Sequence, residues 1–222
     1  DKTAAPTAPF KTLVTHGFTL DSSGKKMSKS LGNIISPAQV MDGTLLPPLK
    51  LRGKAKVEAE AAGTGTRNAL GADALRLWAA SSEYTRDVAM GQPVLQTMAA
   101  ALTKHRSIMK MLLGSMHESA RTAPLTALDH IALVQLGDVV REVGAAFAAH
   151  EFYRGVAVLN NWVSTDLSAF YLEALKDRLY CGDGGGVLEP IFLGMSRMLA
   201  PVAPLLVEEA WDHRPEWMAA DT

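Results

Sequence analysis

The pattern of apolar and polar positions predicts mainly helices from residue 73 onward, because apolar residues recur there every three or four positions. One long helix is expected to begin at Pro93 and end at Gly114, with Val94, Leu95, Met98, Leu102, Ile108, Met109 and Leu112 on one face. Further helices are predicted at residues 127–149, 152–179, 187–199 and 205–212. Helices of these lengths, each with one apolar face, are typical of an antiparallel bundle.

Two details of these helices can also be predicted. The helix at 127–149 is expected to turn the following residues inward: Ile131, Val134, Val139, Val143 and Phe147. The helix at 152–179 is expected to be kinked or broken near Thr165 and Asp166. A stripe of methionines at helical spacing is expected to fill the core: Met98, Met109, Met111, Met195 and Met198.

The first 42 residues have a different pattern. Residues 10–20 are rich in β-branched and apolar side chains and predict a buried strand, and residues 21–24 predict a turn. Ser36, Pro37 and Gln39 form the signature of a helix start, with a capping serine and a capping box. Asp73 is expected to cap a later helix carrying Leu75, Trp78 and Ala79. The predicted fold is therefore mainly α, an antiparallel helical bundle preceded by a small α/β piece.

The same pattern divides the chain into four parts: 1–42, 43–70, 71–92 and 93–222. Residues 43–70 are poor in apolar side chains and contain Pro47 and Pro48, so we predict an insertion without a packed core. Residues 1–9 and 182–186 are expected to form irregular loops, the second of them flexible because it is rich in glycine.

Composition narrows the classes of protein that remain. The apolar content of 48% is enough for a packed core, and we expect no membrane-spanning segment and no signal peptide. A single cysteine, Cys181, excludes an internal disulfide framework and a multi-cysteine zinc site, and it fits a reducing compartment. We therefore do not expect a secreted protein.

The net charge of −1 argues weakly against nucleic-acid binding, but the basic residues are unevenly distributed. Between residues 24 and 56 the only acidic residue is Asp42, against these basic ones: Lys25, Lys26, Lys29, Lys50, Arg52, Lys54 and Lys56. The cluster from Lys50 to Lys56 fits a solubilising loop and a nucleic-acid contact equally well.

The segment with the strongest chemical signal is Lys26, Met27, Ser28, Lys29 and Ser30, followed by Leu31-Gly32-Asn33. Lysine ammonium groups and serine hydroxyls can line a polyphosphate, and charge-assisted hydrogen bonds to phosphate are roughly twice as strong as neutral ones. Such contacts accelerate a reaction if the phosphate charge grows in the transition state. A solvated loop before a helix is the alternative, and the five residues alone do not decide between the two.

Residues 26–33 resemble the KMSKS signature loop of the class I aminoacyl-tRNA synthetases. The segments that extend the resemblance, and that narrow it to the isoleucyl members, lie at residues 9–18, 71–84, 168–180 and 200–211. This resemblance implies that residues 1–42 are the end of a Rossmann-type catalytic domain. It also implies that residues 71–92 are a junction contacting the tRNA stem, and that 93–222 are a helical anticodon-binding domain. Residues 43–70 depart from the family pattern.

The resemblance also implies an activity, the joining of isoleucine to tRNA(Ile) with ATP and Mg²⁺. Lys29 would carry most of the stabilisation of departing pyrophosphate, Lys26 and the hydroxyls of Ser28 and Ser30 would assist, and Asn33 would shape the loop. No metal site is expected in this stretch itself. No His-x-Gly-His motif and no editing domain occur in the sequence, so we expect a piece of the enzyme that is inactive alone.

We expect a monomer in the cytoplasm or the mitochondrial matrix. Valyl or leucyl specificity, or a non-catalytic helical tRNA-binding or interaction module, remain as alternatives.

Other candidate residues favour structural roles. His16 and His105 are isolated, no metal-ligand spacing occurs, and Ser168 has no nearby base. The charged turn at 176–178 fits ion pairing at a helix end somewhat better than a tRNA contact. Trp162 and Trp211 are expected in the core, although exposed aromatic rings could stack on unpaired bases.

Overall fold

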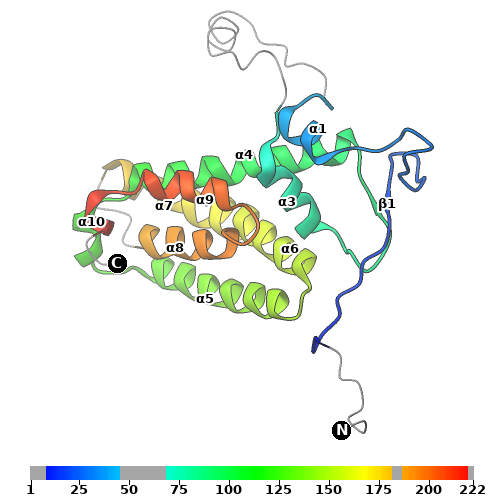
Figure 1. The fold of residues 1–222 in the computed structure, drawn as a ribbon. Helices are drawn as coiled ribbons and strands as arrows, with labels where there is room; N and C mark the ends of the chain where they lie inside the picture. The colour runs from blue at the N-terminus through cyan, green and yellow to red at the C-terminus, as the bar shows by residue number, and fades with distance from the viewer. Residues whose placement is uncertain (1–8, 46–68, 182–186, 220–222) are drawn as a thin grey trace, which may run out of the picture.

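A computed structural model describes residues 9–45, 69–181 and 187–219. The predicted insertion at 43–70, the Lys50–Lys56 cluster and the loop at 182–186 fall almost wholly outside these ranges. Most described residues form a helical bundle, with a small extended piece at one end (Figure 1). The chain is therefore mainly α, as its sequence predicts. Among the described residues, none of the helices has the length and apolar character needed to cross a membrane.

The bundle contains the predicted helices with nearly the predicted bounds. They are α4 (Gln92–Ser115), α5 (Ala127–Ala148), α6 (Phe152–Trp162), α7 (Glu173–Cys181), α8 (Leu188–Leu199) and α9 (Pro204–Asp212). Two short elements are not apparent in the sequence pattern, the 3₁₀ helix η1 (Glu118–Thr122) and helix α10 (Glu216–Ala219). Helix α5 packs against α6 and α8, and α4 packs against α3, α8 and α9.

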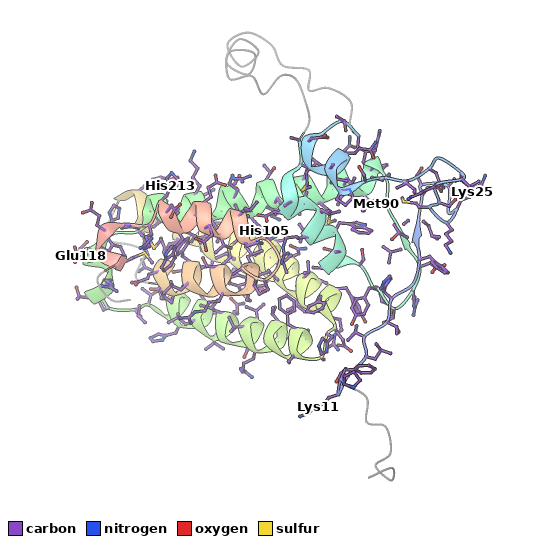
Figure 2. The ribbon with its side chains drawn as sticks, in the orientation of Figure 1. Lys11, Lys25, Met90, His105, Glu118 and His213 are labelled. Carbon is purple, nitrogen blue, oxygen red and sulfur yellow. The ribbon has the colours of Figure 1, made fainter. Side chains whose placement is uncertain are left out.

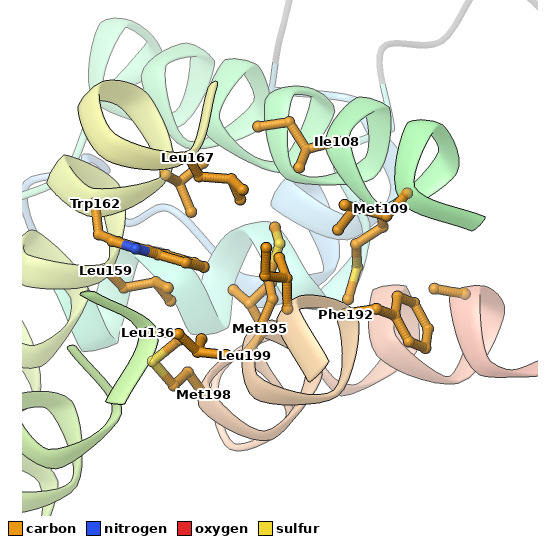
Figure 3. Packing of buried hydrophobic residues seen from close by; sticks show 14 of the residues in the cluster. Ile108, Met109, Leu136, Leu159, Trp162, Leu167, Phe192, Met195, Met198 and Leu199 are labelled. Carbon is orange, nitrogen blue, oxygen red and sulfur yellow. The ribbon is translucent and has the colours of Figure 1, made fainter. Parts of the chain in front are cut away.

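A continuous apolar core lies between these helices (Figure 3). Met109, Met195 and Met198 are buried in it, and Met98 and Met111 pack against it, so the methionine stripe fills the core as predicted. Trp162 is also buried. The prediction for α5 is partly wrong, because Ile131 and Val134 are 47% and 64% exposed. Helix α5 is rotated so that a neighbouring stripe faces the core: Ala132, Leu136, Val139, Val143 and Ala146.

The predicted break in the 152–179 helix is present as a π-helical segment, η2 (Val163–Leu172), between α6 and α7. Two hydroxyls at its start donate to carbonyls four residues earlier. Ser164 Oγ lies 2.7 Å from the carbonyl of Asn160, and Thr165 Oγ1 lies 2.8 Å from that of Asn161. Such side-chain bonds often bend helices, because they compete with the regular backbone pattern.

A buried polar cluster fixes α5 against η2 and α7. Thr126 and Asp129 form a capping box at the start of α5, and the Asp129 carboxylate also accepts hydrogen bonds from Tyr171 Oη (2.8 Å) and Arg178 Nη1 (3.0 Å). Burial raises the pKa of Asp129, but the bonds from Thr126, Tyr171 and Arg178 outweigh it and hold the pKa below its usual value. Arg178 therefore has the structural role that the charged turn favours.

Helix α3 (Gly71–Ser81) joins the extended piece to the bundle. Asp73 does not cap it, contrary to the prediction, since α3 begins two residues earlier. The Asp73 carboxylate instead accepts from the backbone amides of Leu205 (3.3 Å) and Leu206 (2.8 Å), at the start of α9. Arg76 donates to the nearby carbonyls of Pro201 (2.7 Å) and Val202 (3.3 Å). One face of α3 thus clamps the α8–α9 turn.

The predicted buried strand at residues 10–20 is wrong for most of its length. Only β1 (Thr19–Leu20) forms, paired in parallel with β2 (Val88–Ala89). Four apolar side chains before β1 are 49–70% exposed: Phe10, Leu13, Val14 and Phe18. The physical reason is that a strand is buried only by other strands and helices, and among the described residues β1 pairs only with β2 and, at Leu20, with the single residue Lys26.

Candidate nucleotide-binding loop

The lysine loop lies at the end of the molecule that carries β1, where Figure 2 labels Lys25. After β1 the chain turns at Asp21 to Gly24, with Gly24 at φ +77°, and returns antiparallel beside Leu20. The amide of Asp21 donates to the carbonyl of Lys25 (2.8 Å), and that of Met27 donates to Thr19 (3.1 Å). The predicted turn is therefore confirmed, and the motif begins on a strand-like return rather than in a free loop.

The helix after the loop starts as its sequence predicts. Helix α1 (Pro37–Asp42) has Ser36 at its N-cap, and the capping box with Gln39 is complete. Its one buried side chain is Val40, and α1 packs against α3. Both ends of the lysine loop are thus fixed by local hydrogen bonds, one on β1 and one on α1.

Asn33 holds the two sides of the loop together with its amide group. Its Oδ1 accepts from the backbone amide of Ser28 at 3.0 Å, inside the motif. Its Nδ2 donates to Asp21 Oδ2 at 2.8 Å and to the carbonyl of Lys26 at 3.3 Å. A single side chain therefore joins the turn before the motif to its first and third residues, in agreement with the shaping role expected for Asn33.

Asp21 is the second residue that holds the loop in shape. The sequence pattern predicts only that it lies in a turn. Its Oδ1 accepts from the amide of Ser23 (2.9 Å), the hydroxyl of Ser23 (2.7 Å) and the amide of Lys25 (3.0 Å). These bonds, with that from Asn33 the strongest cause, hold the pKa of Asp21 far below its usual value. The carboxylate stays charged at neutral pH, and its hydrogen bonds go to the frame of the loop.

The hydroxyls and the glycine shape the outer turn. Ser28 Oγ accepts from the amide of Leu31 (3.3 Å) and lies 3.2 Å from Ser30 Oγ. Gly32 has φ +65°, in the left-handed region that glycine adopts without a steric cost, and its amide donates to the carbonyl of Lys29 at 3.2 Å. The two serine hydroxyls therefore lie side by side on the loop.

The two lysines of the motif differ in their surroundings. Lys26 Nζ lies 3.7 Å from the centre of the Phe18 ring, a cation–π contact at an exposed position. Lys29 is exposed, and within the described part of the chain its ammonium makes no hydrogen bond or ion pair. The structure thus leaves Lys29 free to meet a ligand, whereas Lys26 has to leave Phe18 to do so. No pattern in the sequence indicates the Phe18 contact.

The loop is attached to the bundle through a second segment that the motif does not reveal. The amide of Phe18 donates to Asp87 Oδ1 at 2.7 Å, and the amides of Val88 and Met90 donate to the carbonyls of Phe18 and Leu20 at 2.8 Å each. Gly17 passes so close to Arg86 that a Cβ there would lie 2.3 Å from the Arg86 carbonyl carbon. Because α4 follows directly at Gln92, the lysine loop and the first long helix of the bundle share one support.

Other predicted candidates lie apart from the loop. His105 is buried in α4 with Nε2 2.9 Å from Asn160 Oδ1, and burial lowers its pKa. No three His, Cys, Asp or Glu side chains come together as a metal site in the described ranges.

Two family models match the sequence. The model described as "tRNA synthetases class I (I, L, M and V)" matches residues 3–91, and the model described as "Anticodon-binding domain of tRNA ligase" matches residues 129–221. The chain belongs to the class I aminoacyl-tRNA synthetases. The first match contains the lysine loop and its β1–β2 support, and the second contains α6 to α9, so both halves of the chain have relatives in this family.

The curated relatives within this synthetase family include isoleucine–tRNA ligases. That of Thermosynechococcus vestitus is 38% identical over 94% of this chain, and the chloroplastic/mitochondrial one of Arabidopsis thaliana is 34% identical over 94% of it. The chain spans about a fifth of their length, 22% and 19%.

A solved structure of the family has the same fold. It is a LeuRS of Agrobacterium radiobacter K84 in a ternary complex with tRNA and LeuAMS, with a TM-score of 0.61 at 21% identity over 89% of this chain and 21% of that one.

Proposed function

We propose that these residues are part of an isoleucine–tRNA ligase, which activates isoleucine with ATP and transfers it to tRNA(Ile). The observation that carries the proposal is the lysine loop itself. Its backbone is held by Asn33 and Asp21, and the ammonium of Lys29 is exposed and unpaired among the described side chains. A preorganised loop with a free cation is suited to a phosphate whose negative charge grows during the reaction, because the protein need not rearrange at that moment.

In this proposal Lys29 binds the phosphates that leave as pyrophosphate. Lys26 joins it by moving from the face of Phe18, and the neighbouring hydroxyls of Ser28 and Ser30 add donors. ATP arrives with Mg²⁺ as part of the substrate complex. The remaining walls of the active site, including the amino-acid pocket, would come from the part of the relatives' length that this chain does not span.

In this proposal the helical region has a second role, the binding of tRNA. We assign residues 1–42 to the end of the catalytic domain, 71–92 to the junction and 93–222 to a domain that binds the anticodon region of tRNA(Ile). Residues 43–70 are assigned to an insertion. The α3 clamp on the α8–α9 turn supports this division, since it ties the junction rigidly to the helical region. We expect the enzyme to be a monomer in the cytoplasm or the mitochondrial matrix.

Amino-acid-dependent exchange of pyrophosphate into ATP by the full-length enzyme tests the specificity. Isoleucine should support exchange with a kcat/KM at least ~100-fold above that for leucine, and valine should be the better of the two competitors. Exchange supported best by leucine or valine would refute the isoleucyl assignment. The 222 residues alone should not charge tRNA, and detectable charging with isoleucine would contradict the assignment of the missing walls to other parts of the enzyme.

A further inference from the structure

Tyr84 contacts both the support of the lysine loop and the helical bundle. It lies between α3 and β2, and its backbone carbonyl accepts the amide of Gly17 at 2.8 Å, on the segment that leads into β1. Its side-chain hydroxyl donates to the backbone carbonyl of His150 at 2.7 Å, between α5 and α6. Figure 1 shows the turn between α5 and α6 at the end of the bundle that faces β1. One residue therefore joins the strand before the lysine loop to that end of the bundle.

The turn between α5 and α6 is held in shape by its own backbone. His150 directly follows the C-cap of α5, and its φ of +61° lies in the left-handed region, where glycine is the usual residue. Two hydrogen bonds close the helix there, from the amide of His150 to the carbonyl of Phe147 (3.0 Å) and from the amide of Glu151 to that of Ala146 (2.8 Å). These bonds fix the direction of the His150 carbonyl that accepts from Tyr84.

Aromatic packing holds the ring of Tyr84 in place beside this turn. Its centre lies 6.4 Å from that of Phe152, the first residue of α6. Phe152 in turn makes an edge-on contact with Phe147 on α5, with the ring centres 5.6 Å apart. Aromatic pairs of this kind stabilise beyond the apolar area that they bury. Removal of the Tyr84 hydroxyl alone should therefore leave the ring where it is.

The extended piece is attached to the helices at two separate places. Trp78 on α3 donates its indole N–H to the carbonyl of Ala89 in β2 at 3.3 Å, and Tyr84 reaches the turn between α5 and α6. A short connection attached at one place can pivot, whereas attachment to two different parts of the bundle fixes an orientation. The Tyr84 hydroxyl thus helps to set the angle between the lysine loop with its support and the bundle.

We propose that Tyr84 is a positioning residue for the transfer of isoleucine to tRNA(Ile), a role that rests on the proposed function. In this step a hydroxyl of the terminal tRNA ribose attacks the carboxyl carbon of isoleucyl-AMP and an ester bond forms. The bond from that carbon to the phosphate oxygen breaks, its electron pair leaves with AMP, and the hydroxyl proton passes to solvent. Isoleucyl-AMP is the product of the preceding activation by ATP, so no further reactant is needed.

The transfer step depends on the orientation that Tyr84 sets. The bundle binds the tRNA near its anticodon while the acceptor end lies in the catalytic part, so the angle between the two parts decides where the attacking hydroxyl lies. A misplacement of ~1 Å can slow a reaction about 100-fold. Activation needs no tRNA, and the lysine loop keeps its own hydrogen bonds from Asn33. Activation should therefore not depend on the Tyr84 hydroxyl.

Kinetics of the full-length enzyme separate a positioning role from a merely structural one. In Tyr84→Phe, single-turnover transfer from enzyme-bound isoleucyl-AMP to saturating tRNA(Ile) should slow about 3- to 10-fold, equivalent to ~0.7–1.4 kcal/mol and in the range of one hydrogen bond. Isoleucine-dependent exchange of pyrophosphate into ATP and the KM for tRNA should each change less than about twofold. The matched control is Tyr153→Phe on α6, because the Tyr153 hydroxyl makes no hydrogen bond among the described residues.

Three outcomes would overturn the role of Tyr84 and leave the proposed function standing. The first is an equal transfer rate for Tyr84→Phe and the unaltered enzyme. The second is an equal loss of exchange and transfer in Tyr84→Phe, which would show a general effect on the fold. The third is an equal slowing of transfer in Tyr153→Phe. An unaltered enzyme that neither exchanges with isoleucine nor charges tRNA(Ile) would refute the proposed function, and the role of Tyr84 with it.

Discussion

Asp73 is expected to hold helix α3 to the bundle. Its replacement by alanine measures how much this contact contributes to the free energy of unfolding. The side chain is 7% exposed, and its carboxylate accepts the backbone amides of Leu205 and Leu206 at the start of α9. Replacement of an N-cap residue costs ~0.5–2 kcal/mol, and hydrogen bonds to a charged group contribute ~1.5–3 kcal/mol each. Because the 3.3 Å bond to Leu205 is long, we expect Asp73→Ala to lower the free energy of unfolding by ~2–3 kcal/mol.

Urea unfolding followed by far-ultraviolet circular dichroism gives this free energy, and a thermal melt should show a fall in Tm of ~4–12 °C. Asp73→Asn keeps the size and one acceptor, so its loss should be smaller, ~1 kcal/mol. The matched control is Glu208→Ala, an exposed carboxylate on α9 itself, which should change stability by less than ~0.5 kcal/mol.

Hydrogen exchange locates the effect of Asp73. In Asp73→Ala the amides of Leu205 and Leu206 should exchange faster, whereas those in the middle of α5 should change only in step with global stability. A loss below ~0.5 kcal/mol, or unchanged protection at the start of α9, would refute the assigned role of Asp73.

Three further predictions concern other polar groups of the structure. Asn33→Ala should speed hydrogen exchange at the amide of Ser28 several-fold while leaving the Tm nearly unchanged, and unchanged exchange there would contradict the frame. Arg178→Met leaves the buried charge of Asp129 without its cation and should cost ~3 kcal/mol in urea unfolding; a cost under 1 kcal/mol would refute this. Burial lowers the pKa of His105 below 6.5 in the folded state, so the unfolded chain binds the proton more readily and stability should fall as pH drops below 6.5. His105→Gln should reduce that pH slope, and an identical slope would refute the assignment.

The helices could be predicted because their signals are local. Periodic apolar residues, Pro93 at a helix start and the capping box of Ser36 all act within a few positions of each other. The rotation of α5 could not be predicted. Its apolar residues, which include both Ile131 and Ala132, cover a wider part of the helix surface than the face that packs against the core.

The contacts that could not be predicted join residues that are far apart in the sequence. Asp73 lies 133 positions from Leu206, so nothing near it indicates that it caps another helix. The strand at 10–20 was predicted as buried from its composition, but its burial depends on neighbours that composition does not specify.

In the lysine loop the motif residues are recognisable in the sequence, and the family resemblance implies the shaping role of Asn33. The supports at Asp21, Phe18 and Asp87 were not, since each is an ordinary turn or strand residue until the fold places it.

The most direct test of the central claim replaces Lys29 by alanine in the full-length enzyme and measures isoleucine-dependent exchange of pyrophosphate into ATP. Lys25→Ala is the matched control, because Lys25 is an exposed lysine of the same turn but lies outside the motif. Loss of a transition-state contact to growing charge predicts a fall of ~100–1,000-fold for Lys29→Ala and less than about twofold for Lys25→Ala. Equal exchange rates for Lys29→Ala and the unaltered enzyme would contradict the account.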